Sequence, residues 1–397
     1  MRALIMNQQL IVPFSHPASH PRIHISFGRR FIALALGLVA FVMRCIIMRR
    51  HQLGKRVLIL EPYGMGDVLS LQPLVCSLYQ SGYLVTVCGR SPWESLIPSA
   101  WRVGWVNANV SWSGYSFSSK YANAFSLLSG FMRQVMALKS AASGAVGLDP
   151  RGDVRSVLLL RAAGCTRIIS LSYYLGTDLP LFPGVAERIH APGDLRRWEL
   201  NLLFAKALGI KLVEQMTAPT VDYLQVRKLT GEGREIGLIP LAPWPGKAWV
   251  PERWIQLASL LRGRGFFPVS FCGPGQAAEL SRVIGSACPQ KTCNSVVEWL
   301  DHLSGLCAVV AVDTGPMHLA DAMGLPTVVL AGSSMLPLWA PAGVASRVLQ
   351  HQSEVHCAPC HQVGSCSESM RQCMRLISID EVLSALSSAM GQLNEHS

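Results

Sequence analysis

A carboxylate follows a glycine-containing turn in the segment PYGMGD at residues 62–67. Gly64 and Gly66 allow the backbone to turn sharply and to approach a ligand closely. Asp67 then stands at the start of a predicted helix, where unpaired N–H groups and the helix dipole favour a negative charge. Asp67 could therefore serve only as a helix cap. The functional alternative is a general base that deprotonates a substrate hydroxyl at the mouth of a cleft.

A second carboxylate, Asp313, begins the segment DTGPMH at residues 313–318, after an apolar stretch and before a predicted helix. Thr314 and Gly315 would present a hydroxyl and backbone N–H groups at the helix N-terminus, an arrangement suited to a diphosphate. His318, one turn later, would face the same phosphate or be a buried structural histidine. This motif is a more specific signal than the first, and it predicts an anion site.

Two further loops carry candidate ligand contacts. Lys247 lies in PWPGKAW at residues 243–249, before another predicted helix, and could place a point charge on a leaving phosphate. The ordinary alternative is a solvent-exposed lysine, and the tryptophans of this loop are expected to anchor it in the core. Gly273, in CGPG at residues 272–275, could admit a nucleotide where another predicted strand ends.

Short apolar runs alternate with segments of helical period around these motifs, a pattern typical of parallel βαβ units. We predict strands at 57–61, 84–88 and 145–148 with a helix at 67–80, a loop at 107–120, and then strands at 236–241, 267–272, 308–312 and 327–331 with helices at 251–264 and 317–323. The fold class is therefore α/β, with two Rossmann-like parallel-sheet domains. They would face a central cleft at the carboxyl ends of their strands.

The apolar periodicity fades around residues 215–235, where proline, glycine and charged residues predict an interdomain linker. We assign residues 55–225 to an N-terminal domain and residues 230–397 to a C-terminal domain.

Residues 1–54 form an N-terminal extension whose apolar segment, 31–48, is interrupted by Arg44 and flanked by arginines. A membrane-spanning helix needs about twenty apolar residues, and the uninterrupted run is shorter than that. Three alternatives stay open: a marginal signal anchor, an interfacial helix on anionic lipid, or a start codon assigned too far upstream.

The charge balance calls for an acidic partner, because 35 Lys and Arg residues against 24 Asp and Glu residues give a net charge of +11. A membrane surface or a phosphorylated substrate fits this balance. Nucleic acid is not expected as a partner, because the sequence has no zinc finger, aromatic RNA-binding motif or dense Lys/Arg block. Most of the 12 cysteines are scattered in apolar stretches, which suits a reducing cytoplasm better than a disulfide framework.

Four cysteines cluster near the C-terminus with the spacing C-x2-C-x5-C-x6-C, namely Cys357, Cys360, Cys366 and Cys373. Four thiolates could close a tetrahedral structural metal site, but the second pair lacks the usual CxxC spacing. We predict no metal, and a structural site in this cluster is the alternative to reduced thiols.

These motifs resemble, in this order, those of glycosyltransferase family 9, which contains the ADP-heptose:lipopolysaccharide heptosyltransferases. The resemblance is carried by GMGD at 64–67 with Pro73, KAWVP at 247–251, CGP at 272–274 and DTGPMHLA at 313–320. Weaker similarities are LDPRGDVRS at 148–156 and RWELNLL at 197–203. The resemblance covers about residues 55–385 and leaves out the N-terminal extension.

The resemblance implies a GT-B fold and an inverting, metal-independent transfer from a nucleotide-diphosphate sugar, ADP-heptose in the family, onto a lipopolysaccharide-core-type acceptor. The N-terminal domain would bind the acceptor and the C-terminal domain the donor. Asp67 would be the catalytic base, with Gly64 and Gly66 on the acceptor side. The donor site would be lined by Lys247, Gly273, Asp313, Thr314, Gly315 and His318.

Three arginines are candidates for binding an anionic acceptor: Arg151, Arg155 and Arg161, of which Arg151 is preferred. No cofactor is expected besides the nucleotide sugar. The expected partners are that donor, an anionic glycolipid and the inner-membrane surface. The enzyme would be cytoplasmic, and either peripheral or anchored by its N-terminus at the inner membrane.

Two departures from the family pattern keep other functions open. Tyr63 stands where a basic or small residue is expected, and the residues APWPG before Lys247 are unusual. The alternatives are a GT-B transferase with another nucleotide sugar or a protein acceptor, and a non-catalytic nucleotide-sugar-binding scaffold. A two-domain dehydrogenase does not fit, because the sequence has no GxGxxG fingerprint with a downstream acidic residue.

Overall fold

The computed structural model describes residues 54–108, 124–171, 186–190, 195–210, 233–336, 338–358 and 371–391, with single residues at 38, 39, 42, 219 and 366. Within these residues no helix has the length and apolar character needed to cross a membrane. Most of the apolar segment 31–48, most of the predicted loop 107–120 and the predicted domain boundary at 225–230 lie outside the described residues.

The first half of the chain forms a six-stranded parallel sheet with the order β3-β2-β1-β4-β5-β6. Its strands are β1 (Arg56–Glu61), β2 (Leu84–Gly89), β3 (Gly104–Asn107), β4 (Val146–Asp149), β5 (Arg167–Leu171) and β6 (Glu187–Ile189). The order reverses between β1 and β4, and in a sheet of this kind the ligand crevice lies beyond the carboxyl ends of the two strands at that point.

The second half repeats this arrangement with the order β12-β11-β10-β7-β8-β9, again with parallel neighbours. Its strands are β7 (Glu235–Ile239), β8 (Phe267–Cys272), β9 (Gln290–Thr292), β10 (Ala308–Val312), β11 (Thr327–Leu330) and β12 (Ser346–Leu349). Read from its opposite edge, this order is the same as that of the first sheet. The predicted pair of Rossmann-like parallel sheets is therefore confirmed, and the second reversal lies between β7 and β10.

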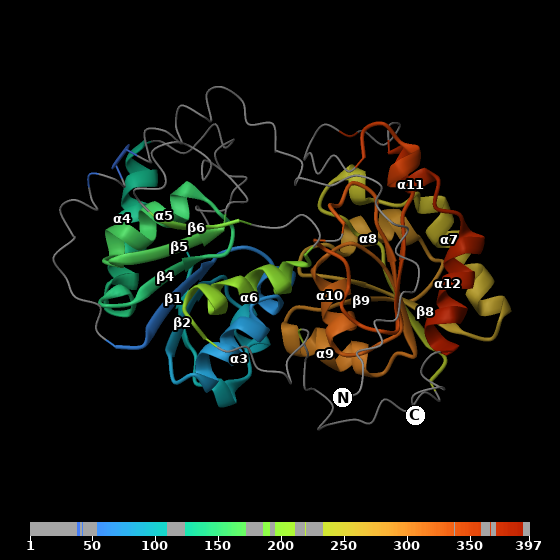
Figure 1. The fold of residues 1–397 in the computed structure, drawn as a ribbon. Helices are drawn as coiled ribbons and strands as arrows, with labels where there is room; N and C mark the ends of the chain where they lie inside the picture. The colour runs from blue at the N-terminus through green and yellow to red at the C-terminus, as the bar shows by residue number, and fades with distance from the viewer. Residues whose placement is uncertain are drawn as a thin grey trace.

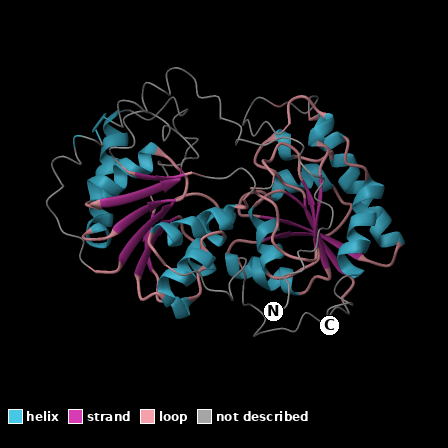
Figure 2. Cartoon of the chain, in the orientation of Figure 1, coloured by secondary structure: helices cyan, strands magenta, loops and turns pink. Residues whose placement is uncertain are grey.

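Helices cover both faces of each sheet, as Figure 2 shows. They are α2 (Met65–Leu69), α3 (Gln72–Gln80), α4 (Ala124–Ala142), α5 (Val154–Ala163), α6 (Arg197–Ala207), α7 (Pro251–Gly263), α8 (Ala277–Ile284), α9 (Val296–Ser304), α10 (Gly315–Ala322), α11 (Gln372–Arg375) and α12 (Ile379–Gly391). Short 3-10 turns lie at Trp93–Leu96, Ser99–Trp101, Pro245–Lys247 and Gln352–Glu354.

Successive residues of β1 supply two different cores, because side chains alternate between the faces of a strand. Leu58 packs in the cluster formed with α4 and α5, on the far side of the first sheet (Figure 1). Ile59 packs in the cluster formed with α3 and α6, which lie on the side that faces the second domain. Both faces are buried, which explains why the strand reads as a continuous apolar run.

One apolar core extends across both domains. The cluster that contains Ile59 of β1 also contains Ala311 of β10 and Trp299 of α9. The helices α9 and α10 cover the inner face of the second sheet, whereas α7, α8 and α12 cover its outer face (Figure 1). The two domains are thus held against each other by shared apolar burial as well as by the polar contacts described below.

The single helix predicted at 67–80 is wrong, because this segment forms two helices, α2 and α3. Pro73 has no N–H to donate to the carbonyl of Leu69, so a continuous helix would lose a hydrogen bond there. The Ser70 hydroxyl instead bonds the carbonyl of Asp67 at 2.6 Å, and the chain restarts as α3 from Leu71. The break leaves α2 as a short helix that carries Asp67.

Candidate active site

The predicted site residues, apart from Gly273, follow the four strands at which the two sheets reverse. Asp67 and Arg151 lie after β1 and β4 of the first sheet, and Lys247 and Asp313 lie after β7 and β10 of the second. Because the carboxyl ends of parallel strands meet at one edge, each sheet brings one carboxylate and one cation together. The sequence motifs therefore lie at equivalent topological positions in the two sheets.

Asp67 is held on both of its oxygens. Its Oδ1 forms an ion pair with Nη1 of Arg151 at 2.6 Å, and each side chain is 12% exposed. Its Oδ2 accepts the backbone N–H of Gly64 at 3.0 Å, so the predicted helix-capping role is real, from the third position of α2 rather than from the cap position. Nε of Arg197 lies 3.9 Å from Oδ1. Two guanidinium groups therefore surround one carboxylate.

A buried ion pair between Arg197 and Glu61 lies next to the Asp67–Arg151 pair. Arg197 is 3% exposed and donates to Oε2 of Glu61 at 2.9 Å and to the carbonyl of Pro150 at 2.6 Å. Burial, together with the nearby charge of Asp67, raises the pKa of Glu61 to about 7. Burial and the charge of Asp153 likewise raise the pKa of Asp149 to about 7. Two carboxyl groups that change charge near neutral pH thus lie under the N-terminal half of the site.

Of the three candidate arginines, Arg151 alone contacts Asp67. Arg155 is buried and its Nε lies 3.0 Å from Oδ1 of Asp153. Arg161 is buried and donates to the carbonyls of Cys165 and Thr166, at 2.9 and 2.7 Å. Arg155 thus stabilises the turn after β4, and Arg161 stabilises the end of α5. We therefore keep Arg151 alone as the candidate acceptor ligand.

Asp313 and Lys247 form the corresponding pair in the second domain, with Nζ 2.7 Å from Oδ2 and exposures of 9% for the lysine and 4% for the aspartate. The alternative that Lys247 is an ordinary solvent-exposed lysine is therefore excluded, and its contact with a phosphate stays a prediction. The Ser334 hydroxyl also donates to Asp313, and Nε2 of His318 lies 3.6 Å away. Burial acts to raise the pKa of Asp313, but the charge of Lys247 and the contact with His318 outweigh it and hold the pKa well below its usual range.

The N-terminus of α10 lies beside this pair. Thr314 is the cap residue, and its hydroxyl donates to the carbonyl of Val312 at 3.2 Å. The cap side chain makes no capping hydrogen bond, Pro316 has no N–H, and the Met317 N–H donates to the Thr314 carbonyl at 3.1 Å. In the first turn, the Gly315 N–H is therefore the group that suits an anion. Gly273 follows β8, the strand next to β7, and its N–H donates to Oε1 of Gln276 at 3.0 Å. No contact joins Gly273 to the other site residues within the described part of the chain.

The two tryptophans of the lysine loop lie in different surroundings. Trp249 is buried and packs edge to face against Trp254 of α7, with ring centroids 5.1 Å apart, so the prediction of an anchor in the core is confirmed for Trp249. Trp244 instead contacts the site, because Nζ of Lys247 lies 4.8 Å from its ring centroid.

Two glycines let α2 and α10 meet across the domain interface. A Cβ atom on Gly66 would lie 2.7 Å from Cδ2 of His318, and one on Gly315 would lie 3.1 Å from Cβ of Met65. Neither space admits a side chain without movement. A backbone hydrogen bond from Arg197 N–H to the Leu338 carbonyl, 2.9 Å long, also crosses the interface. Asp67, which follows Gly66, therefore lies close to α10 of the second domain.

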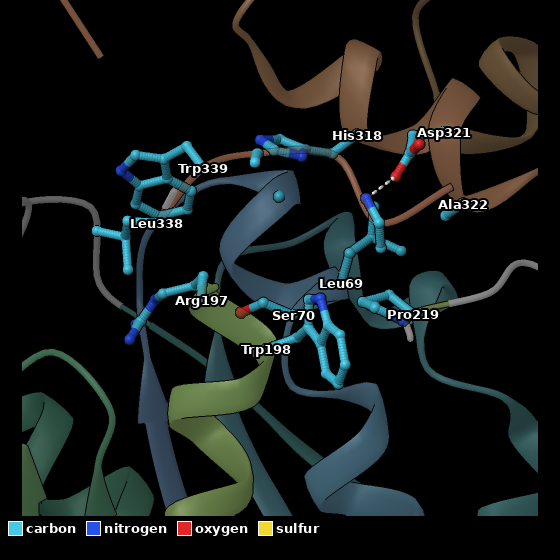
Figure 3. Close-up of a pocket in the computed structure, with 13 residues that line it drawn as sticks. Leu69, Ser70, Arg197, Trp198, Pro219, His318, Asp321, Ala322, Leu338 and Trp339 are labelled. Carbon is cyan, nitrogen blue, oxygen red and sulfur yellow. Dashed lines mark hydrogen bonds between the residues drawn. The ribbon is translucent and has the colours of Figure 1, made fainter. Parts of the chain in front are cut away.

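A hollow of about 380 Å³, including space open to solvent, lies along this interface. Figure 3 shows Trp339 and His318 on one side of it and Trp198 on the other, with Ser70 of the segment after α2 between them. The His318 and Trp339 rings are 6.1 Å apart. The walls are mainly apolar and aromatic, with the charged residues Arg197 and Asp321 among them, and the hollow reaches the contact between Gly66 and His318.

The cysteine cluster is described in part, since Cys360 lies outside the described residues. Cys357 is exposed, Cys366 is half-buried and Cys373 is buried in the outer core of the second domain. Among the described residues, no group of three or more His, Cys, Asp or Glu side chains could hold a metal ion. The metal state of the four cysteines stays a prediction.

Sequence reasoning did not assign three residues of this site. Glu61 is a charged residue that ends an apolar strand, and that placement was the available signal. Arg197 belongs to the RWELNLL segment, whose resemblance to the family carried no assigned role. Ser334 lies after β11, and nothing in its sequence context distinguishes it from other loop serines.

Comparisons with known proteins agree with this geometry. The family model described as glycosyltransferase family 9 (heptosyltransferase) matches residues 146–370. Lipopolysaccharide heptosyltransferase 1 of Pseudomonas aeruginosa is 29% identical over 227 residues, which are 54% of this chain and 61% of that protein. The alignment thus spans less than two thirds of that relative.

Two solved structures share the two-domain fold. E. coli heptosyltransferase WaaC with ADP matches with a TM-score of 0.61 at 18% identity, over 84% of this chain and 99% of that one. E. coli ADP-heptose lps heptosyltransferase II matches with a TM-score of 0.61 at 18% identity, over 86% and 100%. The expected GT-B fold is thereby confirmed.

Proposed function

Because this chain belongs to glycosyltransferase family 9, we propose that it is an inverting, metal-independent glycosyltransferase that moves a sugar from a nucleotide diphosphate onto an anionic glycolipid. One observation carries this proposal above the others. Asp67 lies on α2, and α2 packs against α10 through Gly66 and His318. The proposed base and the helix proposed to bind the diphosphate are thus in contact across the domain interface, which supports the proposal.

In the proposed reaction, Asp67 accepts the proton of the acceptor hydroxyl. The hydroxyl oxygen forms a bond to the anomeric carbon of the donor sugar, while the bond from that carbon to the diphosphate breaks. The electron pair of the broken bond leaves with the diphosphate. Attack from the face opposite the leaving group inverts the anomeric centre. Closure of the two domains over the substrates would exclude water, which is the competing nucleophile.

The second domain would stabilise the leaving diphosphate. Thr314 and Gly315 begin α10, whose N-terminus carries a partial positive charge, and Lys247 lies nearby with a full one. Asp313 would orient both Lys247 and His318 rather than contact the diphosphate through its own negative charge. Gly273, at the end of β8, would leave room for the nucleoside. These cationic groups supply the charge that a divalent metal supplies in other transferases, so we propose a reaction without one.

The proposed donor is ADP-heptose. The support is that one relative is a lipopolysaccharide heptosyltransferase and that one similar structure holds ADP. The proposed acceptor is of the lipopolysaccharide-core type, bound by residues 55–225 near Gly64, Gly66 and Arg151, with residues 230–397 holding the donor. The net charge of +11 favours a phosphorylated acceptor and attachment to the cytoplasmic face of the inner membrane, either peripheral or through the N-terminus.

The direct test is turnover by the full-length protein with ADP-heptose and a heptose-free lipid A–core acceptor. Asp67→Asn should lower turnover by about 100-fold or more, because it removes the general base while keeping the side-chain shape. ADP binding should not change. Asp380→Asn, on the exposed first turn of α12, is the matched control and should behave as wild type. Equal turnover in the wild type and Asp67→Asn would refute the assigned mechanism.

A nucleotide panel separates the remaining alternatives. ADP, UDP, GDP, CMP and ADP-heptose are compared for their effect on thermal unfolding, since a ligand at 100 times its dissociation constant stabilises the folded state by about 2.7 kcal/mol. Selectivity for another nucleotide would keep the mechanism and change the donor. Binding of ADP-heptose without turnover on glycolipid or protein acceptors would identify a scaffold instead of an enzyme.

A further inference from the structure

Both carboxylate oxygens of Asp67, the proposed base, already have hydrogen-bond partners in this structure. Oδ1 of Asp67 is paired with Arg151 at 2.6 Å, and Oδ2 accepts the Gly64 N–H at 3.0 Å. Each oxygen therefore already accepts one short hydrogen bond, which a substrate hydroxyl would have to share or replace. The Gly64 bond belongs to the turn itself, so the ion pair with Arg151 is the contact that an incoming anion can exchange.

In the same position, Arg151 has a second contact that does not involve Asp67. Its guanidinium lies over the ring of Tyr63, 4.0 Å from the centroid. That ring is 8% exposed and is fixed by its hydroxyl, which donates to Oδ2 of Asp153 at 3.1 Å. A guanidinium on an aromatic face keeps its N–H edges available for an oxyanion. The Tyr63 ring therefore provides a platform on which Arg151 can exchange one anion for another.

The neighbouring Arg197 cannot exchange its anion in this way. Arg197 is 3% exposed and is bound to Glu61 and to the Pro150 carbonyl, so its departure would leave a buried carboxylate unpaired. Arg151 and Asp67 are each 12% exposed and reach solvent. If Arg151 turns away, Asp67 still has Arg197 at 3.9 Å. The exposed pair can therefore open while the buried pair stays closed.

We propose that Arg151 is a gate on Asp67, opened by the oxyanion of the acceptor. This inference rests on the proposed function, in which Asp67 is the base. Without acceptor, Arg151 occupies Asp67, and water in the cleft finds no base to take its proton. A phosphate or carboxylate of the acceptor takes over the guanidinium on the Tyr63 ring and releases Oδ1 of Asp67. The acceptor hydroxyl then gives its proton to Oδ1. The gate thus suppresses hydrolysis of the donor until an anionic acceptor is bound.

The first test separates hydrolysis from transfer in the full-length protein. Arg151→Ala should raise the release of ADP from ADP-heptose without acceptor by about tenfold, because the base is permanently open. It should lower kcat/KM for the lipid A–core acceptor by about tenfold or more, mainly through KM. Arg167→Ala removes an ion pair with Glu187 elsewhere in the same sheet and should change neither rate. A parallel fall of hydrolysis and transfer in Arg151→Ala would mean that Arg151 merely positions Asp67, and the gate would be refuted.

A second variant covers the case in which Arg151→Ala does not fold, as judged by its unfolding transition. Arg151→Lys keeps the charge beside Asp67 but loses the planar fork that pairs with an oxyanion. It should keep hydrolysis low and still raise the acceptor KM. Hydrolysis and acceptor KM that both match the wild type would contradict the gate.

The second test needs no turnover, so it separates failure of the gate from failure of the proposed function. Asp67→Asn removes the competing anion, and it should tighten binding of inorganic phosphate about fivefold in calorimetric titration. Adding Arg151→Ala to Asp67→Asn should abolish that gain. The same titration with acetate shows whether the exchanged group is a phosphate or a carboxylate.

The outcomes of the two tests can be told apart. If the gain depends on Arg151 but ADP-heptose is never turned over, the anion exchange stands and the proposed reaction falls. If turnover requires Asp67 but neither anion binds more tightly to Asp67→Asn, the reaction stands and the gate is wrong.

Discussion

The two sheet reversals carry the same pair of charges in opposite order. In the first domain the carboxylate Asp67 follows the first strand and the cation Arg151 follows the fourth. In the second domain the cation Lys247 follows the first strand and the carboxylate Asp313 follows the fourth. Each cation also lies over an aromatic ring from the loop after the first strand, Arg151 over Tyr63 and Lys247 over Trp244.

The pairs differ in how firmly they are held. Asp313 lies among Lys247, Ser334 and His318, all from its own domain, and its carboxylate is 4% exposed. Asp67 is 12% exposed and has one short cationic contact, to Arg151. The comparison teaches that one topology can build a fixed pair and an exchangeable pair. In the proposed function, the fixed pair would shape the donor site and the exchangeable pair would serve proton transfer.

The largest expected difference is in stability. Lys247→Met leaves the buried Asp313 carboxylate without its main partner, which should cost about 3 kcal/mol or more of unfolding free energy. Arg151→Met should cost less than half as much, because Asp67 reaches solvent and keeps Arg197 at 3.9 Å. Urea denaturation of both variants measures the two costs. Equal losses would remove the distinction between a fixed and an exchangeable pair.

The next effect concerns the interface at which the two halves meet. Gly66→Ala would place a Cβ atom 2.7 Å from His318, so the domains must separate slightly and kcat should fall about tenfold. Gly315→Ala meets Met65 at 3.1 Å and should shift the interface less. Steady-state kinetics of both variants tests this order. If the contact is responsible, Gly66→Ala and His318→Ala should be non-additive in a double-mutant cycle, whereas strict additivity would contradict it.

A smaller effect is expected from pH, and it should appear in the first domain. The pKa of Glu61 is raised from 4.5 to about 7, so this carboxyl is neutral below that pH and negative above it. The folded state holds the proton more tightly than the unfolded chain does, so its stability falls as the pH rises from about 4.5 to about 7. Above pH 7 the added negative charge should weaken binding of an anionic acceptor about threefold, which corresponds to about 0.7 kcal/mol.

Acceptor KM measured between pH 6 and 8 shows whether this charge matters. Glu61→Gln should flatten part of the pH dependence, and Asp149, whose pKa is also raised to about 7, should account for what remains. Asp313 stays ionised over this range, because its pKa is held well below the usual value, and it adds nothing to the change. A wild-type KM that does not vary over this interval would argue against titration of Glu61.

The smallest effect on kinetics is expected at the aromatic rings. Tyr63→Phe loses the hydroxyl bond to Asp153 but keeps the ring under Arg151, and it should cost about 1 kcal/mol of unfolding free energy with kcat within about twofold of wild type. Trp244→Phe loses the bond from its Nε1 to the Ser333 hydroxyl, 3.2 Å long, and should behave alike. Thermal unfolding and kinetics together test this, and a large loss of kcat in either variant would mean that more than the ring is needed.

The sequence predicted the parts of this site that depend on strand ends. Glycine-containing turns after apolar runs located Asp67 and Asp313, because a buried parallel strand must end in a polar turn at the cleft edge. The sheet repeat followed from alternating apolar and helical segments, and the strand at 308–312 was predicted to the residue.

The sequence did not predict which charged residues pair when they lie far apart along the chain. Arg197 reaches Glu61 over 136 positions of chain, and nothing local to either residue indicates its partner. Lys247 lies in a loop whose composition suggests exposure, and burial by Asp313 and Trp244 came from tertiary packing. The break between α2 and α3 could have been found at Pro73, since its missing N–H is a local property.

The backbone bond from Arg197 to Leu338 has a mechanical consequence. It joins the first residue of α6 to the second domain through main-chain atoms, so no side-chain substitution at either position deletes it, apart from proline at 197. The side chain of the same residue grips Glu61 and the Pro150 carbonyl at the floor of the first sheet's cleft. Residue 197 therefore links the second domain, through one residue, to the ends of the two strands that are followed by Asp67 and Arg151.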